Sequence, residues 1–233
     1  MLTEEDNKWL SRYYPNLTVG RDIISGTVEF VATYNKETNQ FLILRDGIAD
    51  SVGGLRLTGK FGIRIKERED KTLSKLPALF VDDVQPIPDR HFGQKDFSAC
   101  LCSPLEESEF LIPEFQFRNY FEQLVIPFLY GQLFYSSEKH WPWDEYQHGG
   151  IGLLQSYFQI AELVTEKIIK EFLSYLKQDK NWNLYKMVLF LRRPSRQGCP
   201  CGSNREFRDC HPEALKGLAR LKADISNLSV NID

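Results

Sequence analysis

The chain has 233 residues, a formal net charge of -3 at pH 7 and 42% hydrophobic residues. This supplies enough apolar surface for a packed core, in one sizeable domain with or without a small appendage. No run of 18 apolar residues occurs and the N-terminus is acidic, so we expect neither a membrane span nor a signal peptide. The small net charge argues against nucleic acid as a partner.

The first third of the chain predicts one helix followed by strands. Thr3 can cap a helix that runs through about Tyr13. Segments rich in β-branched and aromatic residues, or with period-two alternation, then predict four strands. These are Gly26–Asn35, Phe41–Leu44, Leu55–Lys66 and Leu76–Val81. We expect them to pair in sequence order, as a four-stranded antiparallel meander.

The rest of the chain is predicted to be helical. Residues Phe117–Phe128 have helical apolar spacing, with Pro127 as a kink or boundary. One apolar stripe over Leu153–Leu176 predicts a single long helix, Asn183–Arg193 is ambiguous, and His211–Leu228 predicts a small final helix. A helix, then antiparallel strands, then helices indicates an α+β domain with segregated layers.

The five cysteines form two tight groups, Cys100 with Cys102 and Cys199 with Cys201 and Cys210. An odd number in two close groups suits thiol chemistry and metal binding better than a disulfide framework. A reducing compartment follows, and we expect a cytoplasmic protein.

The second group predicts a metal finger. Cys199-Pro-Cys201 is followed after eight residues by Cys210-His211, which completes the four nitrogen and sulfur ligands of a tetrahedral structural zinc. Four protein ligands leave no open coordination position, so this zinc is predicted to be structural. Pro194 and Gly198 separate the finger from the preceding helices.

The finger pattern resembles the SEC-C motif, a small zinc finger at the C-terminus of SecA and on other bacterial proteins. The resemblance covers about Gly198–Pro212 and rests on Cys-Pro-Cys-Gly-Ser and on the aromatic Phe207 before the last ligand pair. We therefore expect a main domain at residues 1–193 and a zinc finger with a terminal helix at residues 194–233.

The first cysteine group lies in Asp89–Ser103, an irregular segment behind two prolines. Catalytic groups are often carried by loops on a rigid scaffold, and a catalytic thiol needs exposure together with a depressed pKa or a neighbouring base. The alternative is a pair of core cysteines, since cysteine packs as a small hydrophobic residue. The spacing by itself does not decide between these.

The order of the predicted elements, with a histidine about ten residues before Cys-Leu, resembles the ubiquitin-conjugating (UBC) fold. That family has His-Pro-Asn where this chain has His91-Phe92-Gly93, ahead of Cys100-Leu101. The resemblance gives Cys100 the place of the thioester-forming cysteine, and His91 that of a structural residue that shapes the loop. Gly93 replaces the asparagine, so no side chain at that position can stabilise an oxyanion.

The downstream stretches Trp-Pro-Trp-Asp-Glu-Tyr-Gln-His-Gly and Gly-Leu-Leu-Gln-Ser-Tyr are similar to divergent bacterial conjugating-enzyme-like proteins, including those of CBASS anti-phage operons. The resemblance implies a transferase that joins Cys100 to the activated C-terminus of a partner protein. That partner is a ubiquitin-like protein or a cGAS/DncV-like nucleotidyltransferase, and activation calls for a separate adenylating enzyme or another energy-rich input.

His148 lies in a loop at the start of a predicted helix, whose positive end favours the neutral imidazole, a competent general base. It is either a base that compensates for Gly93 or a loop histidine that caps the helix. Cys102 is a secondary candidate, as a resolving thiol or as a structural residue. Two other functions stay open: a non-catalytic UBC-fold binding module, and a cysteine hydrolase that uses Cys100 with His148.

Overall fold

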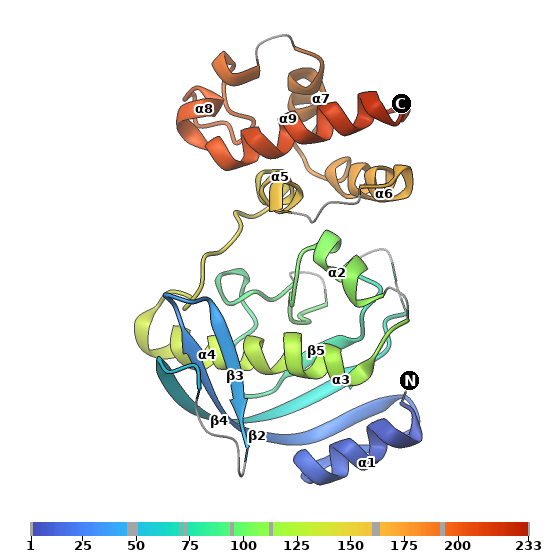
Figure 1. Cartoon of the computed structure of the whole chain (residues 1–233), viewed down its shortest axis with the longest axis vertical. Coiled ribbons are helices and arrows are strands. Elements are labelled where there is room, and N and C mark those ends of the chain that lie inside the picture. The colour runs from blue at the N-terminus through green and yellow to red at the C-terminus, as the bar shows by residue number, and fades with distance from the viewer. Residues whose placement is uncertain are drawn as a thin grey trace. The chain divides into compact units, whose positions relative to one another are not determined.

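The computed structural model describes residues 2–45, 51–69, 71, 74–93, 96–111, 114–159, 164–191 and 194–232 (Figure 1). It has an antiparallel sheet and several helices, so the predicted α+β class is confirmed. The chain divides into two compact units. The first comprises Met1–Cys102 and Phe110–Asp144, and the second comprises Ser103–Glu109 and Glu145–Asp233.

The first unit begins with the predicted helix, α1 (Glu4–Tyr13). Thr3 caps it, because its hydroxyl accepts a hydrogen bond from the Asp6 amide at 3.1 Å while the Asp6 carboxylate accepts one from the Thr3 amide at 2.9 Å. This reciprocal pair satisfies two amides that the helix itself leaves without partners. Trp9 and Leu10 form the buried face of the helix.

Five strands form the sheet of the first unit, in the order β1-β2-β4-β5 with β3 paired to β2. They are β1 (Leu17–Val19), β2 (Ile23–Asn35), β3 (Gln40–Leu44), β4 (Leu55–Lys66) and β5 (Ala78–Val81). The alternation predicted for Leu55–Lys66 is present, with Phe61, Ile63 and Ile65 buried. The predicted meander is wrong, because β3 does not lie between β2 and β4.

The lengths of the strands account for this order. β2 and β4 pair from Ile23↔Lys66 to Tyr34↔Leu55, whereas β3 has five residues and pairs only with the end of β2. Pairing the two long strands directly forms more ladder hydrogen bonds than placing the short strand between them would allow. The short strand is therefore left at the edge, where its residues stay half-buried or exposed.

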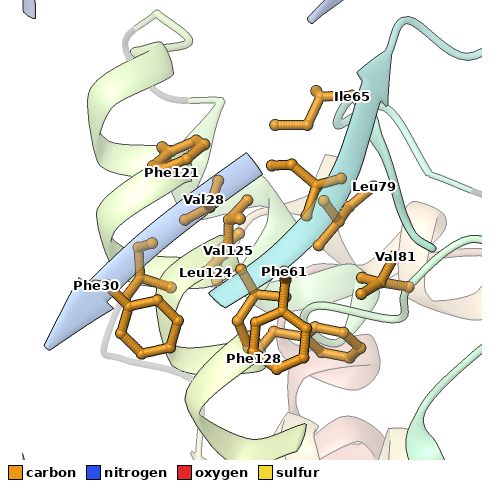
Figure 2. Close-up of a cluster of buried hydrophobic side chains, with 14 of the residues drawn as sticks. Val28, Phe30, Phe61, Ile65, Leu79, Val81, Phe121, Leu124, Val125 and Phe128 are labelled. Atoms are coloured by element: carbon orange, nitrogen blue, oxygen red, sulfur yellow. The ribbon is translucent and has the colours of Figure 1, made fainter. Parts of the chain in front are cut away.

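A helical rod packs on the sheet and closes the core of the first unit. It consists of α3 (Phe117–Tyr120), a π-helical turn (Phe121–Val125) and α4 (Ile126–Glu138). Figure 2 shows Phe121, Leu124, Val125 and Phe128 of this rod directed at apolar side chains of the strands. Pro127 stands in the first turn of α4. Its ring has no amide to donate, and the change from the π-helical turn to α4 lies next to it, where a kink or boundary was predicted; the backbone stays helical across this change.

The second unit is helical. Its elements are α2 (Pro104–Phe110), α5 (Gly150–Gln159), α6 (Glu166–Leu176), α7 (Trp182–Phe190), α8 (Phe207–Cys210) and α9 (Pro212–Asn227). The ambiguous Asn183–Arg193 segment forms most of α7. Helices α5 and α9 pack so closely that a Cβ on Gly217 would lie 1.8 Å from the Leu154 carbonyl oxygen, and they lie side by side in Figure 1.

The prediction of a single helix over Leu153–Leu176 is wrong. Thr165 is extended, with φ -104° and ψ 160°, and its hydroxyl accepts a hydrogen bond from the Ile168 amide at 3.3 Å. A threonine in this conformation is an N-cap, so α6 begins anew after α5. Residues 160–163, which carry part of the predicted stripe, lie outside the described residues.

The division into units also differs from the predicted domain boundary after residue 193. Cys199 and Phe207 of the finger segment are buried in one cluster with Leu154, Phe172 and Val188. A segment this small cannot bury such side chains by itself, so the helices after residue 145 and the finger form one core. No helix within the described ranges has the length and apolar character needed to cross a membrane.

Candidate active site and metal centre

Residues His91–Cys102, the cysteine loop, follow a short 3-10 turn at Pro88–Arg90. The Cys100 amide donates to the His91 carbonyl oxygen at 2.7 Å, and the Gly93 amide donates to the Ser98 carbonyl oxygen at 2.8 Å. The Ala99 amide donates to the Leu79 carbonyl oxygen of β5 at 2.8 Å. The loop is therefore closed at its base and fixed to the edge strand of the sheet.

The loop presents its two cysteines differently. Ser98 and Ala99 are buried immediately before Cys100, which is exposed. Cys102 is half-buried and packs against the hydrophobic core of the first unit. The alternative of two core cysteines therefore does not describe Cys100, whose thiol lies on an exposed residue with a fixed backbone.

Arg68, just after β4, ties down the middle of the loop. Its guanidinium donates to the Asp96 carboxylate at 2.6 Å and to the Ser98 hydroxyl at 2.9 Å. The Ser98 amide and hydroxyl also donate to Asp96, at 3.1 and 2.9 Å. Burial acts to raise the pKa of Asp96, but the bonds from Ser98 and the charge of Arg68 outweigh it and hold that pKa below its ordinary value.

His91 begins the loop in the left-handed conformation, with φ 55°. Its ring lies edge-on to Trp141, with the ring centroids 4.6 Å apart. Trp141 is buried, and its indole N–H donates to the Asp89 carbonyl oxygen at 3.3 Å. A Cβ on Gly131 would lie 2.2 Å from the Trp141 ring, so only glycine admits the indole there. These contacts suit a residue that shapes the loop, the role predicted for His91.

A second anchor holds the turn that leads into the loop. Arg90 donates through Nε to the side-chain oxygen of Gln132 at 2.9 Å, and the Gln132 amide nitrogen donates back to the Arg90 carbonyl oxygen at 2.8 Å. Gln132 is fully buried in α4. The base of the loop is thereby bonded to the central helix of the unit.

Gly93 offers no donor to an oxyanion in this arrangement. It has no side chain, and its amide is bonded to the Ser98 carbonyl oxygen. A thioester-forming reaction at Cys100 must therefore draw oxyanion stabilisation from another group.

His148 is exposed and lies two residues before α5, as its predicted position in the loop requires. The Gly150 amide at the start of that helix donates to the Asp179 carboxylate at 2.5 Å. The first amide of α5 is therefore already bonded to a side chain. His148 belongs to the second unit and Cys100 to the first, so their pairing stays a prediction.

The four predicted metal ligands come together in the second unit. The ligand atoms of Cys199, Cys201, Cys210 and His211 all lie within 4.8 Å of one another. The Cys201 and Cys210 sulfurs are 3.7 Å apart, and the Cys199 sulfur is 3.2 Å from Nδ1 of His211. Sulfurs around a tetrahedral zinc at about 2.3 Å stand roughly 3.8 Å from one another. The cluster could hold a metal ion.

Local backbone structure brings these ligands together. The Cys199 amide donates to the Arg205 carbonyl oxygen at 2.8 Å, which closes a turn in which Gly202 is left-handed, with φ 83°. Helix α8 follows and carries Cys210, and the fully buried Phe207 fixes this helix in the core. The predicted aromatic residue thus anchors the second pair of ligands.

The thiols of the cluster differ in their affinity for protons. Burial raises the pKa of Cys199 to about 12, and its two thiol neighbours add to this. Burial also acts to raise the pKa of Cys201, but hydrogen bonds with Ser203 and the other thiols lower it to about 7. Burial and the nearby Arg205 charge lower the pKa of His211. A thiolate and a neutral imidazole are the forms that bind metals.

Comparisons with protein-family models, with curated proteins and with solved structures found no match to this chain.

Two features of the cysteine loop were not predicted from the sequence. Arg68 is far from the loop in sequence, so no local pattern connects it to Asp96 and Ser98. Phe97 gave a weak signal, as an aromatic residue within a polar loop. Only the structure shows that it is exposed and has a positive φ.

Proposed function

We propose that this protein is a ubiquitin-conjugating-like transferase that carries a partner protein as a thioester on Cys100. The sulfur attacks the carbonyl carbon of an acyl adenylate at the partner's C-terminus. The C–S bond forms, the C–O bond to AMP breaks, and the thiol proton passes to solvent or a base. An acceptor amine then attacks the thioester, the C–N bond forms, and the thiolate leaves with the electron pair of the C–S bond.

The observation that carries this proposal is the presentation of Cys100. Its residue is exposed, while its amide is bonded to His91 and the residue before it is bonded to β5. An exposed thiol on a rigid support suits covalent catalysis. The loop already has a fixed backbone, so the sulfur can react with the carbonyl group of a partner protein without a further entropy cost for ordering the loop.

The fold supports the proposal by resemblance. A leading helix, an antiparallel sheet and a cysteine loop after the last strand follow one another as in the UBC fold. The position of β3 at the sheet edge is a departure from the meander expected of that fold. The partner, a ubiquitin-like protein or a cGAS/DncV-like nucleotidyltransferase in anti-phage defence, rests on the sequence resemblance.

Two further assignments belong to the proposal. His148 is the candidate base for deprotonating the incoming nucleophile. The metal of the finger is zinc, bound by Cys199, Cys201, Cys210 and His211, and it stabilises the second unit without taking part in the reaction.

The test is intact mass spectrometry of the full chain produced together with its neighbouring genes. The wild-type protein is expected to carry a covalent protein adduct that a thiol reductant cleaves. Cys100→Ser is expected to carry an oxygen ester that resists the reductant, and Cys100→Ala no adduct. Cys102→Ser is the matched control and should keep the adduct.

An adduct that persists in Cys100→Ala would refute the proposal and direct attention to Cys102. Absence of any adduct in the wild type, together with tight non-covalent binding of a neighbouring gene product, would favour a binding module. The bonded amide and missing side chain of Gly93 are the observations that favour this second function. Turnover of a thioester reporter without transfer to an amine would indicate a cysteine hydrolase.

A further inference from the structure

Phe97 is an exposed aromatic residue in a strained backbone conformation. The residue is 55% exposed and its φ is 58°. Left-handed backbone is costly for a bulky residue, and such outliers persist only where the surroundings enforce them. Core packing does not explain this one, since the residue is more than half exposed.

The residues around Phe97 hold it in place from both sides. Asp96 and Ser98, its direct neighbours, are both bonded to Arg68. The Phe97 amide itself donates to the Gly93 carbonyl oxygen at 3.1 Å. The backbone therefore cannot relax at residue 97 without breaking this network, and the ring is kept on the surface of the cysteine loop.

The position of Phe97 in the loop relates it to the thiol. It precedes Cys100 by three residues, so the two α-carbons are at most about 10–11 Å apart. A polypeptide whose C-terminal carbon is joined to the Cys100 sulfur spans that distance with about three extended residues. An apolar side chain near the end of such a tail can reach the Phe97 ring.

We propose that Phe97 is a specificity-determining contact for the protein carried on Cys100, and that it binds an apolar side chain within about the last four residues of that protein's C-terminal tail. This inference rests on the proposed thioester function. A phenyl ring held on a rigid support offers a large apolar contact at little cost in side-chain entropy.

The experiment uses Phe97→Gly, because glycine adopts positive φ freely. The variant removes the ring and the strain together, so a ring that does not pack against this chain predicts a melting temperature equal to or above that of the wild type. Three quantities are measured on the full chain: the melting temperature, the alkylation rate of Cys100 by iodoacetamide, and the fraction of chain carrying the adduct in the presence of its neighbouring genes.

The expected result is an unchanged or higher melting temperature, an unchanged alkylation rate, and an adduct fraction lower by about tenfold. Phe97→Leu should retain most of the adduct. Val19→Thr, which changes another exposed apolar residue of the same unit, should behave as the wild type.

Three results overturn the inference. A wild-type adduct level in Phe97→Gly refutes it and leaves the proposed function standing, whereas absence of an adduct in the wild-type protein removes both. A lower melting temperature would mean that the ring packs against this chain itself.

If glycine alters the alkylation rate, Phe97→Asn decides, since asparagine also adopts this conformation. Loss of the adduct in that variant at the wild-type alkylation rate supports the inference, and retention of the adduct refutes it. A changed alkylation rate in both variants would show that the ring supports the loop rather than a partner.

Discussion

Each of the two units carries a Cys-x-Cys pair, and the two pairs have different surroundings. Cys199 and Cys201 are joined by Cys210 and His211, with all ligand atoms within 4.8 Å. Cys100 is exposed at the base of a loop, and Cys102 packs against the core. The same three-residue pattern thus forms a chelating cluster in one unit and a single presented thiol in the other.

The backbone that follows each pair explains the difference. After Cys201 the left-handed Gly202 turns the chain, and α8 brings back two more ligands. After Cys102 the chain continues through Ser103 into α2, and described residues of the loop bond to backbone groups and to Arg68. Convergence of further ligands is what allows the second pair to hold a metal ion, whereas the first pair leaves one thiol on an exposed residue.

The largest difference between the two cysteine pairs is expected when a predicted ligand is removed from the Cys/His cluster. Cys201→Ser is expected to lower the zinc content from about one per chain to near zero. Structural zinc contributes about 10 kcal/mol or more in isolated zinc-finger peptides, so the thermal transition of the second unit should fall markedly. Metal analysis and calorimetry of the full chain measure both effects.

Cys102→Ser is the matched control for the ligand variant, because it changes the other Cys-x-Cys pair. It should keep the zinc and the thermal transition of the second unit. An unchanged zinc content in Cys201→Ser would show that the cluster is not the metal site.

The coupling of the finger to its helices is tested by Phe207→Ala. This fully buried ring joins α8 to the core, and its removal should cost about 3–5 kcal/mol of unfolding free energy. Phe158→Ala, at a residue that is 37% exposed in the same unit, is the control and should cost less than about 1 kcal/mol. Similar losses in the two variants would mean that the finger folds apart from the helices.

The rigidity of the cysteine loop is tested by Arg68→Ala. The change leaves the Asp96 carboxylate and the Ser98 hydroxyl without their guanidinium partner, at an expected cost of about 1–3 kcal/mol. Hydrogen exchange at the Cys100 amide should accelerate, because that amide bonds to His91 across the base of the loop. Arg68→Lys, which keeps the charge but not the two-pronged geometry, should give an intermediate rate. Unchanged exchange in Arg68→Ala would show that the base of the loop is held without it.

The smallest expected effect is a dependence of stability on pH through Asp96. Its pKa in the folded protein lies below the ordinary value of 3.8, so its contribution is present above pH 3.8 and is lost as the pH falls through the folded-state pKa. The difference in unfolding free energy between the wild type and Asp96→Asn should therefore shrink below about pH 4. Urea titrations at several pH values measure it.

Asp22→Asn, which removes an exposed carboxylate of the same unit, controls for the loss of charge. A difference for Asp96→Asn that stays constant down to pH 2 would contradict the assigned direction of the pKa shift.

The sequence predicted those features that depend on neighbouring residues. Thr3 marked the start of α1, the alternation over Leu55–Lys66 marked β4, and Pro127 lies next to the change from the π-helical turn to α4, because capping, alternation and a missing amide act within a few residues. The helix start at Thr165 was not predicted, because the helical spacing of apolar residues continues in the sequence on both sides of this N-cap.

The two candidate sites also differ in how far they could be predicted from neighbouring residues. All four predicted metal ligands lie within thirteen residues, from Cys199 to His211, so their spacing was enough to predict that they converge. The exposure of Cys100 depends on contacts between its loop and residues that are distant in sequence. Arg68 bonds to the middle of the loop and Trp141 packs on its first residue, and no local sequence pattern predicts either contact.

The sequence by itself therefore determined the α+β class, most of the helices and strands, and the members of the Cys/His cluster, because each is encoded by short-range spacing. Only the tertiary structure decided that β4 pairs with β2, that the finger shares a core with α5, α6 and α7, and which cysteine is presented. These features depend on which distant surfaces pack together, and that choice is made by the packing energy of the whole chain rather than by any single segment.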